Sequence, residues 1–234
     1  MKSLAIMQPY FFPYIGYWQL IHTVDHFVIY DDVNYIKGGW INRNRILIND
    51  TPTYITIPLH QSSPYKSICN TFLQSSINWR DKLLKMIENT YRKSPYFTEA
   101  YPVIEKIIHY ETDNLSEYLV HQLRTLTTFM EIKTEFVLTS RSYENDFLSG
   151  QNRVIDICKR ENANVYINAI GGQSLYNSRV FGDAGVNLNF IEMNPLPYKQ
   201  KANEFIPYLS IIDALMEIGS IGIKEHLDSF ELTK

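Results

Sequence analysis

Short apolar runs alternate with longer amphipathic runs along most of this chain. Residues 3–7 (SLAIM) and 26–31 (HFVIYD) favour buried strands, and residues 16–22 between them favour a short helix. Further strands are predicted at residues 136–138, 165–168 and 188–192, with helices at 152–161 and 210–218. This alternation is typical of parallel sheets covered by helices, so we predict an α/β fold with a mostly parallel sheet.

Two other patterns occupy the stretch between the second and third of these strands. Residues 45–48 and 54–57 flank the turn signal NDTP and predict a hairpin, and residues 68–73 predict another strand. Three helices should follow: one capped by Asn78, one with Pro102 in its first turn, and one over residues 115–130. We expect them to form a helical insert, roughly residues 78–131, within a single α/β domain covering residues 1–234.

Composition narrows the class of protein without naming a function. The 234 residues are 45% hydrophobic with a net charge of -3, which gives a full core and no general attraction for nucleic acid. No apolar run approaches the ~20 residues that cross a bilayer, and the first residues lack the apolar core of a signal peptide. Cys69 and Cys158 stand far apart without a metal-binding pattern. We therefore expect reduced thiols, no structural metal and a cytoplasmic location.

The first predicted strand runs directly into an unusual aromatic segment, QPYFFPYIGYW, at residues 8–18. Ligands of open α/β sheets bind beyond the carboxyl ends of the strands, and helix N-termini there can face anions. We interpret the segment as one side of a ligand cleft. Its candidate site residues are Gln8, Tyr10, Tyr14, Gly16 and Tyr17. The alternative is that its rings, Phe11, Phe12, Tyr14 and Trp18 among them, are core.

The second predicted strand ends in two adjacent carboxylates, Asp31 and Asp32. One of them could orient a substrate amine, act as a base or hold Mg²⁺, and at most one should enter the site because neighbouring strand residues point to opposite faces. Alternatively, both cap the loop.

The loop that follows interleaves cations with rings around a Gly-Gly pair. Arginine and lysine bind phosphates, and rings stack on a base or a sugar, so a nucleotide-sugar fits this loop. A solvated basic loop anchored by Trp40 is the alternative. The candidate binding residues here are Tyr35, Lys37, Trp40, Asn42 and Arg43.

A third strand end, at residues 165–168, places Asn168 at the same expected edge. Its amide can contact a polar ligand, and the backbone amides of Gly171 and Gly172 can face an anion. Tyr176 follows closely. We predict that Gln8, Tyr14, one of the two aspartates and Asn168 converge on one cleft.

Five segments of the chain resemble the WbqC-like family: MQPYFFPYIGYWQLI, VDHFVIYDDVNYIKGGWINRNRI, AIGGQSLYNSRVF, LNFIEMNPLPYKQ and FIPYLSIIDALMEIG. The resemblance spans nearly the whole chain and implies a role in bacterial surface-polysaccharide (O-antigen, lipopolysaccharide) synthesis. The opening is also similar to nucleotidyltransferases of the pantothenate synthetase type, which implies a Rossmann-like fold. Tyr14 and Tyr17 stand where that group has two histidines, and Gly16 matches its glycine.

These resemblances leave three classes of function open. The first is an N-acyl or aminoacyl transferase acting on a nucleotide-linked amino sugar, with Asp31, Asp32 and Tyr14 as catalytic candidates. An amino acid or acyl donor would then be a second substrate, and ATP with Mg²⁺ would be needed if a carboxylate is activated. The second is a nucleotidyltransferase, although a neutral phenol supplies only a hydrogen bond where histidine stabilises phosphates. The third is a non-catalytic nucleotide-sugar-binding or scaffolding protein.

Overall fold

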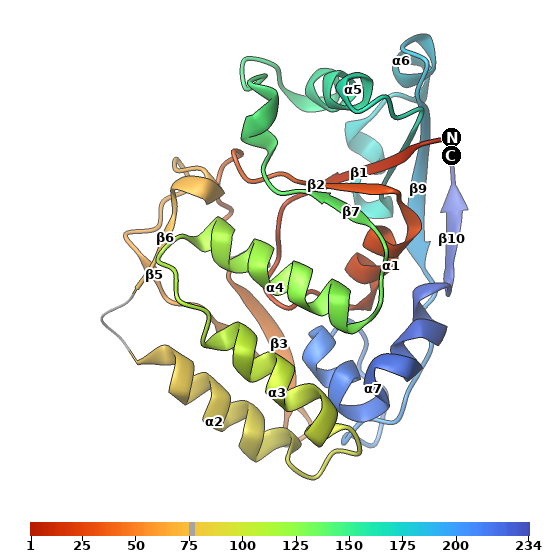
Figure 1. Cartoon of the computed structure of the whole chain (residues 1–234). Coiled ribbons are helices and arrows are strands. Elements are labelled where there is room, and N and C mark those ends of the chain that lie inside the picture. The colour runs from red at the N-terminus through yellow and green to blue at the C-terminus, as the bar shows by residue number, and fades with distance from the viewer. Residues whose placement is uncertain (75–77) are drawn as a thin grey trace.

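The computed structural model describes residues 1–74 and 78–234, which form a mixed α/β fold with a mostly parallel central sheet (Figure 1). The sheet order is β10-β9-β8-β1-β2-β7. The bounds of its strands are β1 Ser3–Met7, β2 His26–Ile29, β7 Glu135–Val137, β8 Val165–Ala169, β9 Asn187–Met193 and β10 Phe230–Thr233. All neighbouring strands pair in parallel except β10, which runs antiparallel to β9. The predicted fold class is therefore confirmed.

Side chains alternate along each strand and so feed two hydrophobic layers. Leu4 and Ile6 of β1 pack with the helices α5 (Gly150–Arg160) and α6 (Ser178–Asp183). Ala5 lies between them in sequence and joins the other layer, with α1 (Ile15–Thr23) and α7 (Ile211–Leu227). Figure 1 shows α5 and α6 above the sheet, with α1 and α7 below it. Helices thus cover both faces, as expected for a sheet whose central strands are apolar throughout.

Three consecutive helices extend the second layer: α2 (Trp79–Tyr91), α3 (Phe97–Ile108) and α4 (Leu115–Phe129). Their buried side chains belong to the same cluster as those of α1 and α7. Asn78 caps α2, since its side chain accepts a hydrogen bond from the Asp81 amide. The division of the chain into one domain with an insert at residues 78–131 stays a prediction.

Two predicted elements differ from the structure. Pro102 lies in the interior of α3, because the helix begins at Phe97, where the Tyr96 amide donates to the Met216 carbonyl of α7 and the helices pack together. The segment 68–73 is a 3-10 turn (η1, Ile68–Asn70) followed by a short strand, β6 (Phe72–Leu73). The Cys69 amide bonds to the Asp31 carbonyl there, so the segment follows the loop instead of extending.

The remaining elements are small. The predicted hairpin is present as β3 (Arg43–Ile48) and β4 (Thr51–Thr56), and its turn residues Asn49 and Asp50 both have positive φ, as a type I′ hairpin turn requires. A two-residue strand, β5 (Leu59–His60), pairs with β6. Short 3-10 segments η2 (Ser140–Tyr143) and η3 (Ile170–Leu175) follow β7 and β8. No helix in the described ranges is both long and apolar enough to cross a membrane.

Candidate functional site

The direction of the chain across the sheet reverses between β1 and β8. Taken in chain order, the six strands lie in the arrangement 3-2-1-4-5-6, with the first and fourth side by side. Loops leaving such a pair go to opposite sides and open a crevice at the carboxyl edge. Gln8 follows β1 and Asn168 is the second-last residue of β8, so the structure places both at this edge.

The backbone that leaves β1 is held by buried polar side chains. Phe12 has a φ of 40°, a conformation that costs free energy for a bulky residue. Gln122 of α4 accepts a hydrogen bond from the Phe12 amide and donates one to the Tyr10 carbonyl. Asn44 of β3 donates to the carbonyls of Phe11 and Phe12 at 3.0 and 2.8 Å. These bonds fix residues 10–12 in one strained conformation before any ligand binds.

The rings of this segment divide between the core and the surface. Phe11, Phe12 and Trp18 are fully buried, and Tyr17 is buried with its hydroxyl donating to the Gln8 carbonyl. The core interpretation therefore describes these four rings. Tyr10 and Tyr14 are only half-buried and face a pocket.

We call this cavity the outer pocket. It has a volume of 270 Å³. Its lining residues are Tyr10, Pro13, Tyr14, Trp40, Asn44, Arg45 and Tyr208. Burial raises the pKa of both Tyr10 and Tyr14, so their phenols stay protonated near neutral pH and can donate hydrogen bonds. Three of the sequence candidates, Tyr10, Tyr14 and Trp40, meet here.

Arg45 provides the charge of the outer pocket. Its guanidinium lies over the Trp40 ring at 5.5 Å, and its buried Nε has no hydrogen-bond partner in the protein. Within residues 1–74 and 78–234, no carboxylate lies within ion-pair distance of it. A half-buried cation without a counter-ion is costly, and an anionic ligand would remove that cost.

The other cation of this strand, Arg43, is engaged by its own loop. Its Nε donates to the Gly39 carbonyl at 3.2 Å, its Nη2 donates to the Gly38 carbonyl, and its guanidinium lies over the Tyr54 ring. Tyr35 and Asn42 form a buried pair in which the phenol donates to Asn42 Oδ1 at 2.8 Å. Lys37 is exposed at the tip of the loop. These contacts give Tyr35, Asn42 and Arg43 roles in the shape of the loop.

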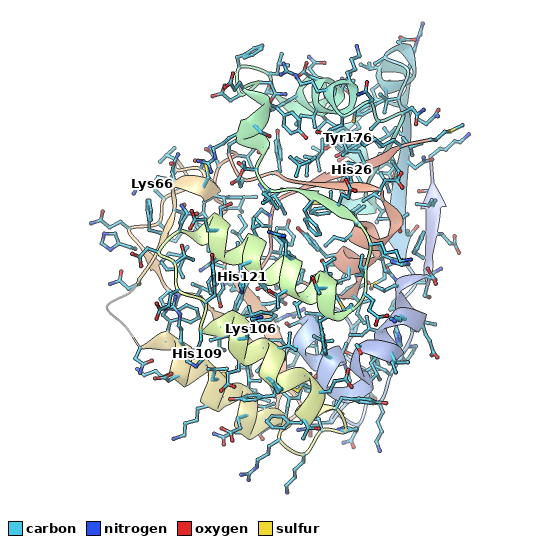
Figure 2. All side chains as sticks on the ribbon, viewed as in Figure 1. His26, Lys66, Lys106, His109, His121 and Tyr176 are labelled. Atoms are coloured by element: carbon cyan, nitrogen blue, oxygen red, sulfur yellow. The ribbon has the colours of Figure 1, made fainter. Side chains whose placement is uncertain are left out.

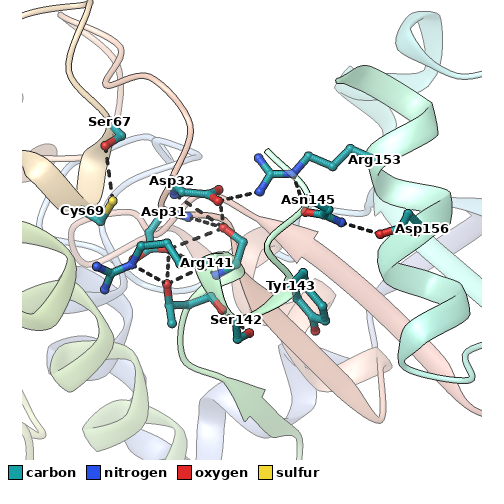
Figure 3. Close-up of polar contacts among 12 residues, drawn as sticks. Asp31, Asp32, Ser67, Cys69, Arg141, Ser142, Tyr143, Asn145, Arg153 and Asp156 are labelled. Atoms are coloured by element: carbon teal, nitrogen blue, oxygen red, sulfur yellow. Dashed lines mark hydrogen bonds and ion pairs between the residues drawn. The ribbon is translucent and has the colours of Figure 1, made fainter. Parts of the chain in front are cut away.

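Asp31 and Asp32 lie in a polar network between β2 and η2 (Figure 3). Asp31 is 1% exposed; its carboxylate accepts hydrogen bonds from the hydroxyls of Ser116 at 2.6 Å and Thr139 at 2.8 Å, and from the Ser140 amide. Asp32 accepts from the Ser140 hydroxyl and forms a 2.5 Å ion pair with buried Arg153.

The oxygens of these two carboxylates are not available to Mg²⁺, because hydroxyl and guanidinium groups already donate hydrogen bonds to them. Across the two described ranges, no three His, Cys, Asp or Glu side chains gather as metal ligands do. The geometry instead gives both aspartates the task of joining β2 to the segment after β7.

Of the two glycines after β8, only Gly172 is required by the packing of its neighbours. A side chain at Gly172 would meet the Asn168 amide nitrogen at 2.6 Å, whereas Gly171 has open space around it. Asn168 itself is buried and accepts a hydrogen bond from the Ala169 amide. Tyr176 packs in the layer of α5 and α6, with its hydroxyl 3.4 Å from that of Tyr166. Gly16 lies under the Tyr14 ring and the Met193 sulfur.

A larger and more open cavity lies on the other side of α4, between that helix and β7. Its volume is 590 Å³, and Asp31, His121, Arg124 and Arg141 are among its lining residues. His121 projects from α4 near Lys106 of α3 (Figure 2). Burial and the charges of Lys106 and Arg124 lower the His121 pKa. This cavity shares no lining residue with the outer pocket, so Asp31 does not join Tyr10 and Tyr14 in one cleft.

Four lining residues of the outer pocket were missed as sequence candidates: Pro13, Asn44, Arg45 and Tyr208. A signal existed for Arg45, because Arg43 and Arg45 alternate along a strand and so share a face. Tyr208 has a φ of 61° and comes from a segment without regular structure near the C-terminus. Nothing in the local pattern links it to residues 10–14.

The fold defines a Rossmann-like protein, and the outer pocket beside the segment that leaves β1 is its candidate ligand site. Comparison with known proteins then places it: the WbqC-like protein family matches residues 8–225, and the chain belongs to that family. It is also similar to "Uncharacterized protein Rv1507c" of Mycobacterium tuberculosis, with 27% identity over 223 residues, 94% of this chain and 95% of the relative. No solved structure matches the chain.

Proposed function

We propose that the protein is an enzyme of surface-polysaccharide synthesis that binds a nucleotide-linked amino sugar in the outer pocket and transfers an acyl or aminoacyl group to the sugar nitrogen. The observation that carries the proposal is the Arg45 guanidinium, which lacks an anionic partner and lies among four aromatic side chains. A nucleotide-sugar offers both the anion and the rings that such a pocket accepts.

In this arrangement Arg45 holds a phosphate of the diphosphate group. Trp40 or Tyr208 covers the face of the base or of the sugar, since both rings line the pocket and are partly exposed. A volume of 270 Å³ accommodates one ring and a phosphate, so the rest of the ligand extends along the carboxyl edge of the sheet. Gln8 and Asn168 lie at that edge and are candidates for polar contacts with it.

The transfer step itself needs an activated acyl donor, either a thioester or an acyl phosphate. The amine nitrogen attacks the acyl carbonyl, a C–N bond forms, and the bond to sulfur or phosphate oxygen breaks with its electron pair. The amine proton passes to the leaving group or to water. Tyr14 lines the pocket as a neutral phenol and can donate a hydrogen bond to the carbonyl oxygen as charge develops there. Buried free thiols are consistent with a reducing compartment such as the cytoplasm.

Adenylyl transfer is less well supported. The resemblance to nucleotidyltransferases puts two phosphate-binding side chains at positions 14 and 17. Tyr17 is buried, and its hydroxyl already donates to the Gln8 carbonyl at 2.8 Å. Only Tyr14 of the pair faces a cavity, so half of that phosphate site is missing.

Calorimetric titration with UDP-glucosamine tests the proposal. Arg45→Ala should weaken binding tenfold or more, because a hydrogen bond to a charged group contributes about 1.5–3 kcal/mol. Arg45→Lys should recover only part of the loss, since an ammonium cannot present a planar fork to a phosphate. Lys85→Ala removes the same charge from the exposed face of α2 and should leave the affinity unchanged.

Product analysis separates an enzyme from a binding protein. Incubation of the protein with UDP-glucosamine and an acyl thioester should give a nucleotide-sugar heavier by one acyl group in mass spectrometry, and Tyr14→Phe should slow its formation. Equal affinities of wild type and Arg45→Ala would remove the outer pocket as the nucleotide site. Binding without any product would leave a nucleotide-sugar-binding protein.

A further inference from the structure

A second and smaller cavity lies on the far side of Tyr14 and Tyr208 from the outer pocket. We call it the inner pocket. It is enclosed by α1, by α7 and by the segment 194–209, and its volume is 20 Å³. Such a volume holds one group the size of a water molecule or an ammonium ion. Its polar lining residues include Gln19 and His226, and its rings include Tyr14, Tyr198 and Tyr208.

Gln19 places an unpaired acceptor in this pocket. The side chain is 1% exposed, and its Nε2 donates to the carbonyls of His226 at 2.7 Å and Ser229 at 2.8 Å. Those two carbonyls fix the orientation of the amide, because a flipped Gln19 would direct its oxygen at two other oxygens. The oxygen Oε1 is therefore the free end of the side chain, and it has no hydrogen-bond partner in the protein.

His226 adds a second unpaired acceptor. It is 9% exposed, and its Nδ1 lies 2.9 Å from the Gly222 carbonyl oxygen. A carbonyl oxygen only accepts, so the proton of the neutral ring is on Nδ1 and the lone pair is on Nε2. Nε2 is buried and, like Gln19 Oε1, has no partner in the protein. A buried acceptor that is left unpaired is unfavourable, so the two acceptors favour an occupant that donates hydrogen bonds.

Two of the side-chain donors beside the inner pocket are already in use. Gln19 Nε2 is engaged as described, and the Tyr198 hydroxyl donates to Asp213 at 2.8 Å. A water molecule that donated to both acceptors would keep two lone pairs that need donors of their own. An ammonium group has three donors and no acceptor, and it matches the pocket better. The tyrosine rings of the wall add attraction for a cation.

From this geometry we propose that the inner pocket binds the primary amino group of a small ligand, with Gln19 Oε1 and His226 Nε2 accepting its N–H bonds. This site is distinct from the phosphate site at Arg45 and does not depend on it. The amine can belong to an amino sugar or to an amino acid, since the chemistry that the two acceptors recognise is the same.

A route into the inner pocket passes the aromatic pair that both pockets share. The rings of Tyr14 and Tyr208 meet edge to face with their centroids 5.7 Å apart. Tyr208 is 53% exposed, and its backbone is in the left-handed region that disfavours bulky side chains. Because both rings line both pockets, displacement of Tyr208 is the route by which an amine would reach the inner acceptors.

Nitrogen NMR of the full chain tests the inference with probes that carry no phosphate. The resonance of His226 Nε2 and the side-chain amide resonances of Gln19 are followed during titration with glucosamine, glucose, glycine and glycolate. Glucose and glycolate are the matched analogues of glucosamine and glycine, with a hydroxyl group in place of the amino group. We expect shifts at both residues with one or both amines, and none with glucose or glycolate. A response to glucosamine alone identifies an amino sugar, and a response to glycine alone identifies an amino acid.

His226→Phe provides the mutant arm. It removes the Nε2 acceptor while keeping a flat ring in the helix, and it should abolish the response of Gln19 to the amine. Because this variant also loses the bond to Gly222, its melting temperature is measured alongside, and the wild-type titrations decide the matter if it unfolds. Equal shifts with amine and hydroxyl probes, or no shift with either amine, would overturn the inference and leave the pocket to an ordinary buried water. With either result, the titration of the Arg45 variants would still decide separately whether the outer pocket binds a nucleotide-sugar.

Discussion

Two buried amides, Asn44 and Gln122, determine the conformation of the segment that leaves β1. They come from β3 and α4, and together they bond to the backbone of residues 10, 11 and 12. The Ser210 hydroxyl adds a further bond to the Phe12 carbonyl at 2.9 Å. Buried polar side chains are costly unless they are fully paired, and here the pairing is complete enough to hold a strained Phe12.

Replacing Asn44 tests this role at the scale of one residue. Asn44→Ala leaves the carbonyls of Phe11 and Phe12 without their donor and should lower the free energy of unfolding by about 1–3 kcal/mol, as measured by urea titration. Asn44→Asp keeps the shape but directs an oxygen at two carbonyls, so it should be at least as destabilising. Asn203→Ala, at an exposed position, should change stability by less than about 0.5 kcal/mol. A stable Asn44→Asp would contradict the assignment.

The start of helix α1 shows how an element is shaped by the pocket beside it. Tyr14 is the N-cap residue and makes no side-chain cap hydrogen bond. Its ring instead folds over Gly16, where a Cβ atom would lie 2.4 Å from Tyr14 Cε2 and 3.1 Å from the Met193 sulfur. The absence of a side chain at Gly16 therefore allows the Tyr14 ring to line both pockets. This packing explains the glycine without any contact between Gly16 and a ligand.

Gly16→Ala should displace Tyr14 and weaken ligand binding in the outer pocket severalfold. The helix itself should tolerate alanine, which is the better helix former, so any loss of stability should come from the clash with the ring. Gly182→Ala in α6 is the matched control, because its new methyl group meets open space. Thermal unfolding and UDP-glucosamine titration of both variants provide the comparison. Identical behaviour of the two alanine variants would mean that Tyr14 moves aside at no cost.

Across the whole molecule, Asp213 connects three parts of the chain that are distant in sequence. This buried residue of α7 accepts hydrogen bonds from Tyr91 of α2 at 2.9 Å, and from Tyr198 and Gln200 of the segment 194–209 at 2.8 and 3.0 Å. Gln200 in turn bonds to the backbone of Ile206 through both ends of its amide. The segment that closes the inner pocket is thereby fixed to the helical layer.

Asp213 also predicts how stability depends on pH. Burial raises its pKa above the ordinary value of 3.8, against the opposing hydrogen bonds from Tyr198 and Tyr91. The folded state thus binds the proton more tightly than the unfolded state, and the contribution of Asp213 to stability grows as pH falls through the raised pKa toward 3.8. Asp213→Asn removes the titration and places an NH2 group against the donors of one former carboxylate oxygen, which are Tyr91 at Oδ1 or Tyr198 and Gln200 at Oδ2.

The variant should therefore be less stable than wild type at pH 7, and the difference should widen between pH 7 and pH 4. Urea unfolding at several pH values measures both parts. Glu225→Gln, at an exposed position of α7, serves as a control for the general charge of the helix. A difference that narrows on acidification would mean that the hydrogen bonds outweigh burial at Asp213.

Much of the fold followed from local patterns. Strands such as 3–7 and 165–168 were predictable because apolar residues that are buried on both faces leave an unbroken run. The Asn78 cap followed from the geometry of a single helix end. Strand β10 was missed, because its pairing partner β9 is far away in sequence and the short segment FELT has no strong pattern of its own. Pro102 was misplaced for the same kind of reason, since contacts with α7 support a helix start that local rules disfavour.

For the candidate site, too, one part was predictable from the sequence and another part was not. Sequence reasoning located the edge of the sheet and three of the rings, because the order of elements determines which strand ends are neighbours. It could not tell which arginine lacks a partner in the protein, because Arg43 and Arg45 differ only in the groups that surround them after folding. Nor could it foresee that Ser116, Thr139 and Arg153 would engage Asp31 and Asp32.

The sequence by itself determined the succession of strands and helices, the parallel sheet and the family, because each depends on periodicity and on motifs read along the chain. The tertiary structure alone decided which aromatic residues are core, which arginine lacks a partner and how Tyr208 comes to lie beside Tyr14. The physical reason is that hydrophobic burial follows local patterns, whereas the pairing of a polar group depends on which partners the whole fold brings within about 3 Å of it.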